Sequence, residues 1–185
     1  MSEIYAPPKL ITPFRHSDHR GFFAETFSRK KYEELGIDFE FVQDNHSLSH
    51  AAGTIRGLHF QIPPFAQAKL VRCGQGSIFD VAVDIRVESP TFGKWKGYKL
   101  TAENGHQFYV PIGFAHGFIT LEPNSEIIYK CSNYYNQKCE RSVLWSDPNI
   151  GIKWELEGQP TLNEKDRIAP LLEDFESPFI FGVNS

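Results

Sequence analysis

The sequence predicts an antiparallel all-β fold, in its most economical form a double-stranded jelly-roll barrel with short flanking helices. The clearest sign is the run Ile78–Arg86, in which apolar residues at odd positions alternate with Asp80, Ala82, Asp84 and Arg86. A period of two with one apolar and one charged side is typical of a β-strand. Similar runs recur between residues 20 and 154, separated by Gly, Pro, Asn and Ser turns at the spacing of a sandwich or barrel. In addition, 15 Ile and 8 Val, 23 together, outnumber 12 Leu, a mixture that favours strands over helices.

Each element can be assigned in order along the chain. One helix is expected over residues 29–35, because Ser28 is a favourable N-cap residue and Gly36 is placed to end the helix. A second, short helix is expected to begin near Thr161, where Thr161 and Glu164 have the capping-box spacing, and to end before Pro170. The remaining runs predict strands over residues 20–27, 39–43, 54–61, 68–73, 78–86, 107–110, 117–121, 126–135 and 142–145.

Length, charge and cysteine usage narrow the class of protein. Residues 1–185 are expected to form a single domain, since the sequence has no internal repeat, low-complexity linker or charge block. The net charge of −4 gives no overall attraction to nucleic acid. The longest apolar stretches fall far short of the roughly 20 residues that span a bilayer. Cys73, Cys131 and Cys139 form an odd set without a Cys-x-x-Cys pair, so we expect free thiols in a reducing cytoplasm.

Two histidines have unusual surroundings. His59 lies in the run Arg56–Gln61, where strand alternation places it on the same face as Gln61. Two polar side chains in an apolar context indicate a polar cavity, although a hydrogen-bonded core histidine is the plainer interpretation. His116 ends the pattern Pro-x-Gly-x-x-His, the second half of the motif of metal-binding cupins. The first half, His-x-His, ends here in Gln61, so only two good ligands remain and no metal is predicted.

Tyrosines and isolated basic residues are further candidates. In an unbroken strand, Tyr129, Cys131, Asn133 and Tyr135 would share one face. Two interpretations of these tyrosines stay open: structural anchoring through buried hydroxyls, or a general acid beside a surface that stacks a ring. Because the chain as a whole is acidic, an anionic ligand would need local Arg and Lys side chains, each of which is otherwise ordinary surface charge. No dinucleotide fingerprint, Walker loop or nucleophile elbow is present.

Eight motifs taken together resemble one enzyme family. Over about residues 8–172 the chain is similar to the dTDP-4-dehydrorhamnose 3,5-epimerase family, with the family's motifs in the family's order. These motifs are Arg20–Glu25, Phe41–Ser47, Arg56–Gln61, Gln67–Leu70, Phe79–Arg86, Gly113–Phe118, Asp147–Ile152 and Glu164–Asp166.

The resemblance implies a cupin that works without metal or cofactor, usually as a homodimer, on the sugar nucleotide dTDP-4-dehydro-6-deoxy-D-glucose. The product is then a precursor of dTDP-L-rhamnose, a donor for lipopolysaccharide O-antigen. The resemblance implies that His59 is the base, Asp166 its carboxylate partner, Tyr129 the proton donor on the opposite face, and Lys69 the group near the C4 oxygen. It also implies that Tyr135 stacks on the thymine and that some contacts from the Arg20–Glu25 strand come from the neighbouring subunit. The residues implied to contact the nucleotide sugar are Arg20, Glu25, Gln43, Asn45, Arg56, His116, Tyr135, Glu140 and Lys165.

The chemistry of a 4-keto sugar is consistent with these assignments. The ketone acidifies the hydrogens on C3 and C5, because the resulting carbanion spreads onto the C4 oxygen as an enolate. Inversion of either carbon then needs a base on one face of the ring and an acid on the other. An imidazole suits the base near neutral pH, and a carboxylate partner fixes its tautomer and stabilises the imidazolium.

Strict alternation raises one geometric difficulty. It places Arg56 and His59 on opposite strand faces, and likewise Arg20 and Glu25. A shared pocket therefore needs a β-bulge, for which Gly57 and Gly21 are candidates, or a second subunit. Three other functions stay open: a single-centre 3- or 5-epimerase or ketoisomerase acting on a related 4-keto sugar nucleotide, a metal-dependent cupin, and a non-catalytic sugar-binding domain.

Overall fold

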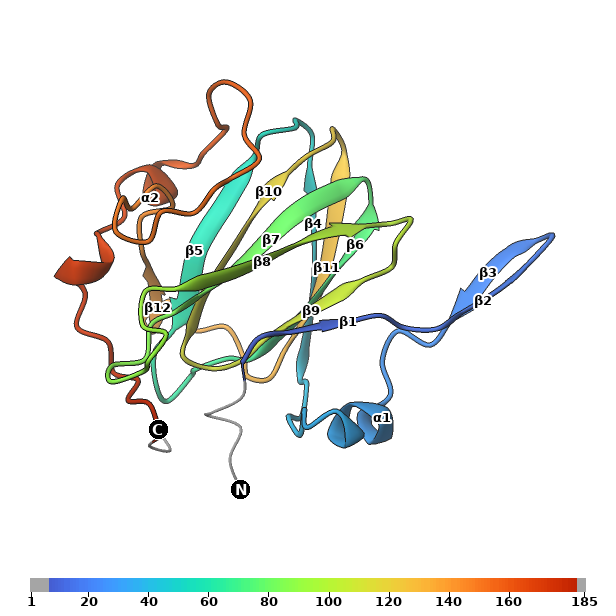
Figure 1. Ribbon diagram of the computed structural model, residues 1–185, viewed down its shortest axis with the longest axis horizontal. Helices are drawn as coiled ribbons and strands as arrows, with labels where there is room; N and C mark the ends of the chain where they lie inside the picture. Colours follow the sequence, from blue (N-terminus) through green and yellow to red (C-terminus); the bar gives the residue numbers. More distant parts are fainter. Residues whose placement is uncertain (1–6, 183–185) are drawn as a thin grey trace.

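A computed structural model describes residues 7–182, and two five-stranded antiparallel sheets form most of this part of the chain (Figure 1). The first sheet has the order β1-β9-β6-β11-β4, with β1 at Lys9–Ile11, β9 at Gln107–Val110, β6 at Lys69–Gln75, β11 at Ser125–Cys131 and β4 at Gln43–Ser49. The second sheet has the order β12-β5-β10-β7-β8, with β12 at Glu140–Ser142, β5 at Ile55–Gln61, β10 at Phe114–Thr120, β7 at Ser77–Asp84 and β8 at Trp95–Thr101. The two sheets confirm the predicted double-stranded jelly roll.

A separate hairpin extends away from the two sheets. It consists of β2 (Arg15–Asp18) and β3 (Gly21–Ala24), and Figure 1 shows it projecting to the right of the barrel. We call residues 15–24 the arm. Short helices flank the barrel: α1 (Arg29–Glu34) follows the arm, and α2 (Glu164–Arg167) and the 3-10 turn η1 (Leu172–Asp174) lie in the C-terminal segment near β5 (Figure 1). No helix within residues 7–182 is long and apolar enough to cross a bilayer.

Apolar side chains are buried in three layers. Between the two sheets, Val71, Phe108 and Ile127 of the first sheet pack against Phe114 and Phe118 of the second. The C-terminal segment covers the outer face of the second sheet, through residues such as Val143, Leu172 and Phe179. Tyr32 and Ile37, in and just after α1, cover the outer face of the first sheet at Leu70 and Tyr109. Both sheets are therefore covered on both faces over much of their area.

The strand that best predicted the fold class is buried on both sides. All eight residues of β7 are buried, including Asp80 and Asp84, which the alternation pattern placed on a charged face. Phe79, Val81 and Val83 pack under the C-terminal segment, whereas the face that carries Asp80 is turned to the barrel interior. The charged side of this strand therefore marks the polar interior of the barrel and not its solvent surface.

Several predicted boundaries were wrong. Residues 39–42 form no strand in the described chain: Phe39 and Phe41 pack beside the α1 cluster, and β4 begins only at Gln43. Strands β1, β2 and β8 were not predicted. The strand predicted over residues 126–135 ends at Cys131, so Asn133 and Tyr135 lie in the following loop.

Both helices were predicted, but their caps differ from expectation. The Ser28 side chain makes no capping hydrogen bond to α1, although Ser28 does precede it. Asn163, and not Thr161, caps α2, and its side chain accepts a hydrogen bond from the backbone N–H of Asp166. Thr161 instead pairs with Thr54 as an isolated parallel bridge.

Candidate active site

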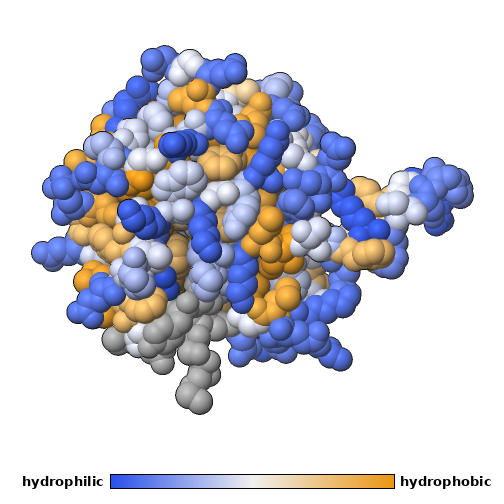
Figure 2. All heavy atoms as spheres, in the orientation of Figure 1, coloured by the Kyte–Doolittle hydropathy of each residue, from blue (hydrophilic) through white to orange (hydrophobic). Residues whose placement is uncertain are grey.

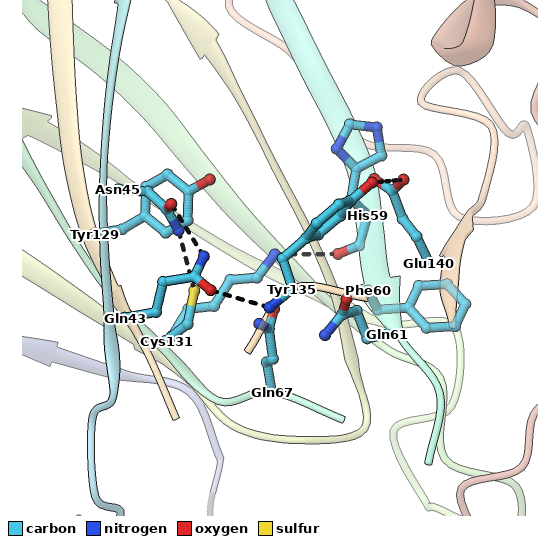
Figure 3. Close-up of a pocket in the computed structure, with 11 residues that line it drawn as sticks. Gln43, Asn45, His59, Phe60, Gln61, Gln67, Tyr129, Cys131, Tyr135 and Glu140 are labelled. Atoms are coloured by element: carbon cyan, nitrogen blue, oxygen red, sulfur yellow. Dashed lines mark hydrogen bonds between the residues drawn. The ribbon is translucent and has the colours of Figure 1, made fainter. Parts of the chain in front are cut away.

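A polar pocket of about 320 Å³ opens between the inner faces of the two sheets, on the side where β4 and β5 face each other. Figure 3 shows Tyr129 and Asn45 on one side of this pocket and His59 on the other. The lining side chains are Gln43, Asn45, His59, Phe60, Gln61, Gln67, Lys69, Tyr129, Cys131, Tyr135 and Glu140.

One wall of the pocket is built by cross-strand pairs between β4 and β11. Tyr129 lies opposite Asn45, and Cys131 lies opposite Gln43. The side chains form a chain of contacts, in which the Gln43 Nε2 donates to Asn45 Oδ1 at 3.0 Å and the Asn45 Nδ2 donates to Cys131 Sγ at 3.5 Å. The Gln43 Oε1 also accepts a hydrogen bond from the Tyr135 backbone N–H at 3.0 Å. This wall therefore presents fixed amide groups to a ligand.

The opposite wall carries a histidine–carboxylate pair. The Nε2 of His59 lies 2.5 Å from Oδ1 of Asp166, although 107 residues separate them in the sequence. Asp166 is fully buried, and its Oδ2 accepts a hydrogen bond from the Gly57 backbone N–H at 3.3 Å. Because the carboxylate accepts at Nε2, that nitrogen carries the proton in neutral His59, and Nδ1 is left as the basic atom. The arrangement expected from the family motifs is thus present in the structure.

A β-bulge at Gly57 resolves the alternation difficulty. In the β5–β10 ladder, His59 pairs with His116 and Arg56 pairs with Phe118, so two residues of β5 oppose the single residue Gly117. Gly57 has φ +134°, and a Cβ at this position would lie 2.5 Å from the Gly117 Cα. Beyond the bulge, the Arg56 side chain reaches across to β4, donating to the Ser49 Oγ and the Leu48 carbonyl at 3.3 Å each. Arg56 therefore lies on the β4 side of β5, close enough to Tyr129 to act on its pKa, although it is not among the residues that line the pocket.

Lys69 and Tyr129 are perturbed by burial. Desolvation lowers the pKa of Lys69, while nearby Cys131, Asp80 and Glu140 act in the opposite direction. The Lys69 Nζ donates to the His59 carbonyl at 3.5 Å. Burial also raises the pKa of Tyr129, against the opposing effect of Arg56, so the phenol holds its proton. The pocket thus places the Lys69 amine beside a phenol that keeps its proton.

A second histidine–carboxylate pair lies behind the first. The Nε2 of His116 lies 2.6 Å from Oδ1 of Asp80, and both residues are buried. Burial lowers the pKa of His116 although Asp80 raises it, which favours the neutral imidazole. His116 was predicted to contact substrate, but it is not among the residues that line the pocket. Asp80 was not predicted as a site residue. The sequence feature that could have indicated it is its place on the charged side of the Ile78–Arg86 run.

The rim of the pocket holds three of the predicted residues in one network. The Tyr135 hydroxyl donates to Glu140 Oε2 at 3.0 Å, and the Lys165 Nζ lies 2.5 Å from Glu140 Oε1. Burial acts to raise the pKa of Glu140, but the hydrogen bonds from Lys165 and Tyr135 lower it on balance. Tyr135 is 56% exposed, so its ring is available for stacking.

Two further predicted residues lie away from this pocket, in or next to the arm. Arg20 lies in the turn of the arm, where it is exposed and pairs with Asp18 at 2.6 Å. Glu25 follows the arm and pairs with Lys31 at 2.7 Å. Neither residue lines the pocket of its own chain.

Gln61 stands where metal-binding cupins have a histidine ligand, and here its side chain binds the backbone of neighbouring segments. Its Nε2 donates to the carbonyls of Phe65 at 2.6 Å and Tyr134 at 3.0 Å, and its Oε1 accepts from the Asn136 backbone N–H at 2.6 Å. Gln61 therefore fixes the loop that carries Tyr135. His59 and His116 each have Nε2 against a carboxylate, and within residues 7–182 no three His, Cys, Asp or Glu side chains are grouped as metal ligands.

Comparison with known proteins adds independent findings. Residues 6–174 match the protein family described as dTDP-4-dehydrorhamnose 3,5-epimerase. A protein of that name from Salmonella typhimurium strain LT2 is 52% identical over 165 residues, which cover 89% of this chain and 90% of the relative.

Solved structures agree in fold. A crystal structure of dTDP-6-deoxy-D-glucose-3,5-epimerase from Legionella pneumophila Philadelphia 1, in complex with dTDP-4-keto-L-rhamnose, superposes with a TM-score of 0.88 at 48% identity, covering 91% of this chain and 89% of that one. A 3′-monoepimerase from Streptomyces bikiniensis, in complex with dTDP-quinovose, superposes with a TM-score of 0.84 at 38% identity, covering 90% of this chain and 84% of that one.

Proposed function

This chain belongs to the dTDP-4-dehydrorhamnose 3,5-epimerase family, and on that premise we propose that it converts dTDP-4-dehydro-6-deoxy-D-glucose to dTDP-4-dehydro-L-rhamnose by inverting C3 and C5. It is an isomerase of the carbohydrate epimerase class. The observation that carries the proposed mechanism is the placement of His59 and Tyr129 on opposite walls of one pocket, one from each sheet (Figure 3).

His59 takes the proton from the sugar carbon. The pair of electrons of the C–H bond moves into the ring and onto the C4 oxygen, which gives an enolate and an imidazolium. Asp166 stabilises the imidazolium through its bond to Nε2, which leaves Nδ1 to accept the proton. Because Asp166 is buried and held by the Gly57 N–H, it keeps the ring in one orientation during this step.

Tyr129 returns a proton to the opposite face of the same carbon. Its hydroxyl proton forms the new C–H bond, the enolate collapses to the ketone, and the configuration is inverted. The tyrosinate recovers a proton and the imidazolium loses one through exchange with solvent, after which the second carbon reacts in the same way. Burial supports this role because it keeps Tyr129 protonated until a carbanion is present.

Lys69 offsets the charge of the enolate. Its ammonium lies in the pocket between the two walls and is partly desolvated, which strengthens its interaction with a developing oxyanion. A single donor of this kind contributes about 3–4 kcal/mol to transition-state stabilisation in other enzymes.

The remaining polar residues are proposed to bind the nucleotide sugar. Gln43 and Asn45 on one wall and Glu140 at the rim offer hydrogen-bonding groups, and the exposed ring of Tyr135 offers a surface for the thymine. Arg56 and Lys165 supply positive charge near the opening for the diphosphate. His116 supports the pocket from behind through the β5–β10 ladder.

We also propose that two copies of the chain form a homodimer in which the arm of one completes the pocket of the other. The arm projects from the body of the molecule, and Figure 2 shows it standing clear with apolar residues among its exposed atoms. Phe22 is 58% and Phe23 71% exposed, and Arg20 is left without any role in its own pocket. Mixing inactive Arg20→Ala chains with inactive His59→Ala chains is expected to restore part of the activity, because one site of each mixed dimer is then intact.

Residues 1–185 are proposed to act as one domain, since both sheets contribute to the same pocket. The three free cysteines support a reducing, cytoplasmic location.

One alternative is favoured by a specific observation. The 3′-monoepimerase shares this fold at a TM-score of 0.84, so the barrel alone does not distinguish inversion at one carbon from inversion at two. NMR in D₂O with dTDP-4-dehydro-6-deoxyglucose separates them. Deuterium at both C3 and C5 is the expected result, deuterium at one carbon would identify a single-centre epimerase, and no exchange would contradict the proposal.

A further inference from the structure

Asp166 lies in a helix that is too short to be stable by itself. α2 has four residues, far below the length at which an isolated helix persists in water. Its N-cap is Asn163, whose Oδ1 accepts a hydrogen bond from the backbone N–H of Asp166 at 2.7 Å. The Asn163 side chain is therefore bonded directly to the residue whose carboxylate faces His59.

The segment before α2 is fixed to the start of β5. The Thr161 carbonyl accepts from the Ile55 N–H at 3.0 Å, and the Thr161 N–H donates to the Gly53 carbonyl at 2.9 Å. These bonds hold the backbone at Thr161, but they do not determine how the next turn of the chain rotates. Two backbone bonds close that turn, from the Arg167 N–H to the Asn163 carbonyl at 3.2 Å and from the Ile168 N–H to the Glu164 carbonyl at 3.3 Å. The bond from Asn163 is the one made by a side chain, and it is made at Asp166 itself.

Asp166 makes both of its polar contacts inside the protein. Its Oδ1 lies 2.5 Å from His59 Nε2, and its Oδ2 lies 3.3 Å from the Gly57 nitrogen. A rotation of α2 would lengthen both contacts at once. A misplacement of about 1 Å in a catalytic group can cost about 100-fold in rate.

We propose that Asn163 is a positioning residue for the epimerase reaction, which by capping α2 holds the Asp166 carboxylate against His59. The proposal rests on the function proposed above for His59 and Asp166. Asn163 does not line the pocket, so it acts through Asp166 and not on the substrate. Lys165, a proposed diphosphate contact, also lies in α2, but its long side chain has rotatable bonds that can compensate for a small rotation of the helix, so substrate binding should be affected less than the rate.

The test compares three variants with the wild type by kcat, KM and thermal unfolding. Asn163→Ala removes the cap, and we expect kcat to fall by about 10- to 100-fold with KM little changed. Asn163→Ser keeps a side-chain oxygen at the N-cap and should restore most of kcat, because Ser and Asn are comparable caps. The matched control is Asn104→Ala, which removes the hydrogen bonds that Asn104 Oδ1 accepts from the backbone of Thr101 and His106 in a turn outside the pocket. Asn104→Ala should keep the wild-type kcat.

A second readout does not depend on turnover. The proton on His59 Nε2, held in a 2.5 Å contact with Asp166, should give a low-field ¹H NMR signal in the wild type. This signal should be lost or broadened in Asn163→Ala and return in Asn163→Ser. An Asn163→Ala protein with unchanged kcat and signal, or an Asn163→Ser protein no better than Ala, would overturn the proposal. A wild-type protein that shows the signal but no exchange at C3 or C5 would instead contradict the proposed function.

Discussion

His59 lies directly opposite His116 in the β5–β10 ladder, and each imidazole holds a different buried carboxylate. The two pairs have similar lengths, 2.5 Å for His59–Asp166 and 2.6 Å for His116–Asp80. They differ in access, since the His59 side chain is 25% exposed and the His116 side chain 8%. Of these two histidines, His59 is therefore the one that a ligand in the pocket can reach, while His116 and Asp80 lie behind it.

Replacing Asp166 by Asn should separate catalysis from binding. The amide fills the same space but no longer stabilises an imidazolium, so kcat is expected to fall by about 10²- to 10⁴-fold. Binding of dTDP, measured by calorimetry, should be unchanged because Asp166 is fully buried behind His59. An unchanged kcat would remove Asp166 from the mechanism.

Replacing Tyr129 by Phe should uncouple deprotonation from inversion. His59 is untouched, so deuterium from D₂O should still enter the substrate, now with retention of configuration. The inverted product should be lost or greatly reduced, because no acid remains on the opposite wall. NMR of the product mixture measures both effects, and a normal yield of inverted product would show that another group is the acid.

Gln61→Ala should act on affinity more than on rate. Gln61 makes three hydrogen bonds to the backbone, two of them to Tyr134 and Asn136 beside Tyr135. Loss of bonds worth about 1 kcal/mol each should loosen this loop and raise KM by roughly 10-fold. Gln67→Ala is a useful comparison, since Gln67 makes a single bond to the same loop, at Asn133, and should give a smaller rise in KM.

Gly57→Ala should be strongly destabilising. The added methyl group would lie 2.5 Å from the Gly117 Cα and 2.9 Å from the His116 carbonyl oxygen, and neither backbone atom can move away cheaply. The φ of +134° adds a conformational penalty, so the expected loss exceeds about 3 kcal/mol. The control is Gly158→Ala, where φ is +79° but no atom lies within 4 Å of the new methyl group. Thermal unfolding should show a much smaller effect there, and equal effects would mean that the close approach of β5 and β10 is unimportant.

Stability should decline at alkaline pH. Burial raises the pKa of Cys73 from 9.0 to about 11 and that of Tyr32 from 10.0 to about 12. Both groups are neutral in the folded and unfolded states below pH 9, so their contribution is fully present there. As pH rises, the unfolded chain ionises first, and the contribution is lost progressively until the folded pKa is passed.

Cys73→Ala checks this prediction. A shift of this size for Cys73 corresponds to about 2–3 kcal/mol, lost between roughly pH 9 and 11. The unfolding free energy of Cys73→Ala, measured with denaturant across this range, should fall less steeply than that of the wild type. If the unfolding free energies of the two proteins fell in parallel with pH, the raised pKa of Cys73 would be contradicted.

Periodicity predicted the fold class because strands such as β7 alternate clearly, and it failed for strands with few buried residues. β4 was placed too early because its sequence, Gln43–Ser49, has polar residues on its pocket face and on its exposed face. Strand β8 was missed since only Leu100 among its residues is buried. His59, Tyr129 and Lys69, which the family motifs named, do line one pocket. Tyr129 and Lys69 lie on the paired strands β11 and β6, whereas His59 faces them from β5 of the other sheet.

The rest of the site depends on contacts that local sequence does not encode. The Asp166–His59 contact spans 107 residues and is made by a single helical turn, so no strand pattern could indicate it. The role of Gln61 in holding the 132–136 loop is equally non-local. Arg20 lies in the arm and Glu25 directly after it, both away from the pocket of their own chain, so the contacts that the family motifs imply for them depend on the proposed second chain.

The complete burial of β7 has a consequence for motion within the pocket. β7 is hydrogen-bonded on both edges, to β8 and β10, and covered on both faces, so its amide hydrogens should exchange with solvent only when the whole domain unfolds. β4 is an edge strand with half-exposed residues, and its amides should exchange through small local openings. Asp80 lies on β7 itself, His116 on the adjacent β10 and His59 on β5 beyond it, whereas Gln43 and Asn45 lie on the edge strand. The proposed base is thus carried by the sheet that holds the buried strand, and the edge strand that carries Gln43 and Asn45 can adjust to a ligand.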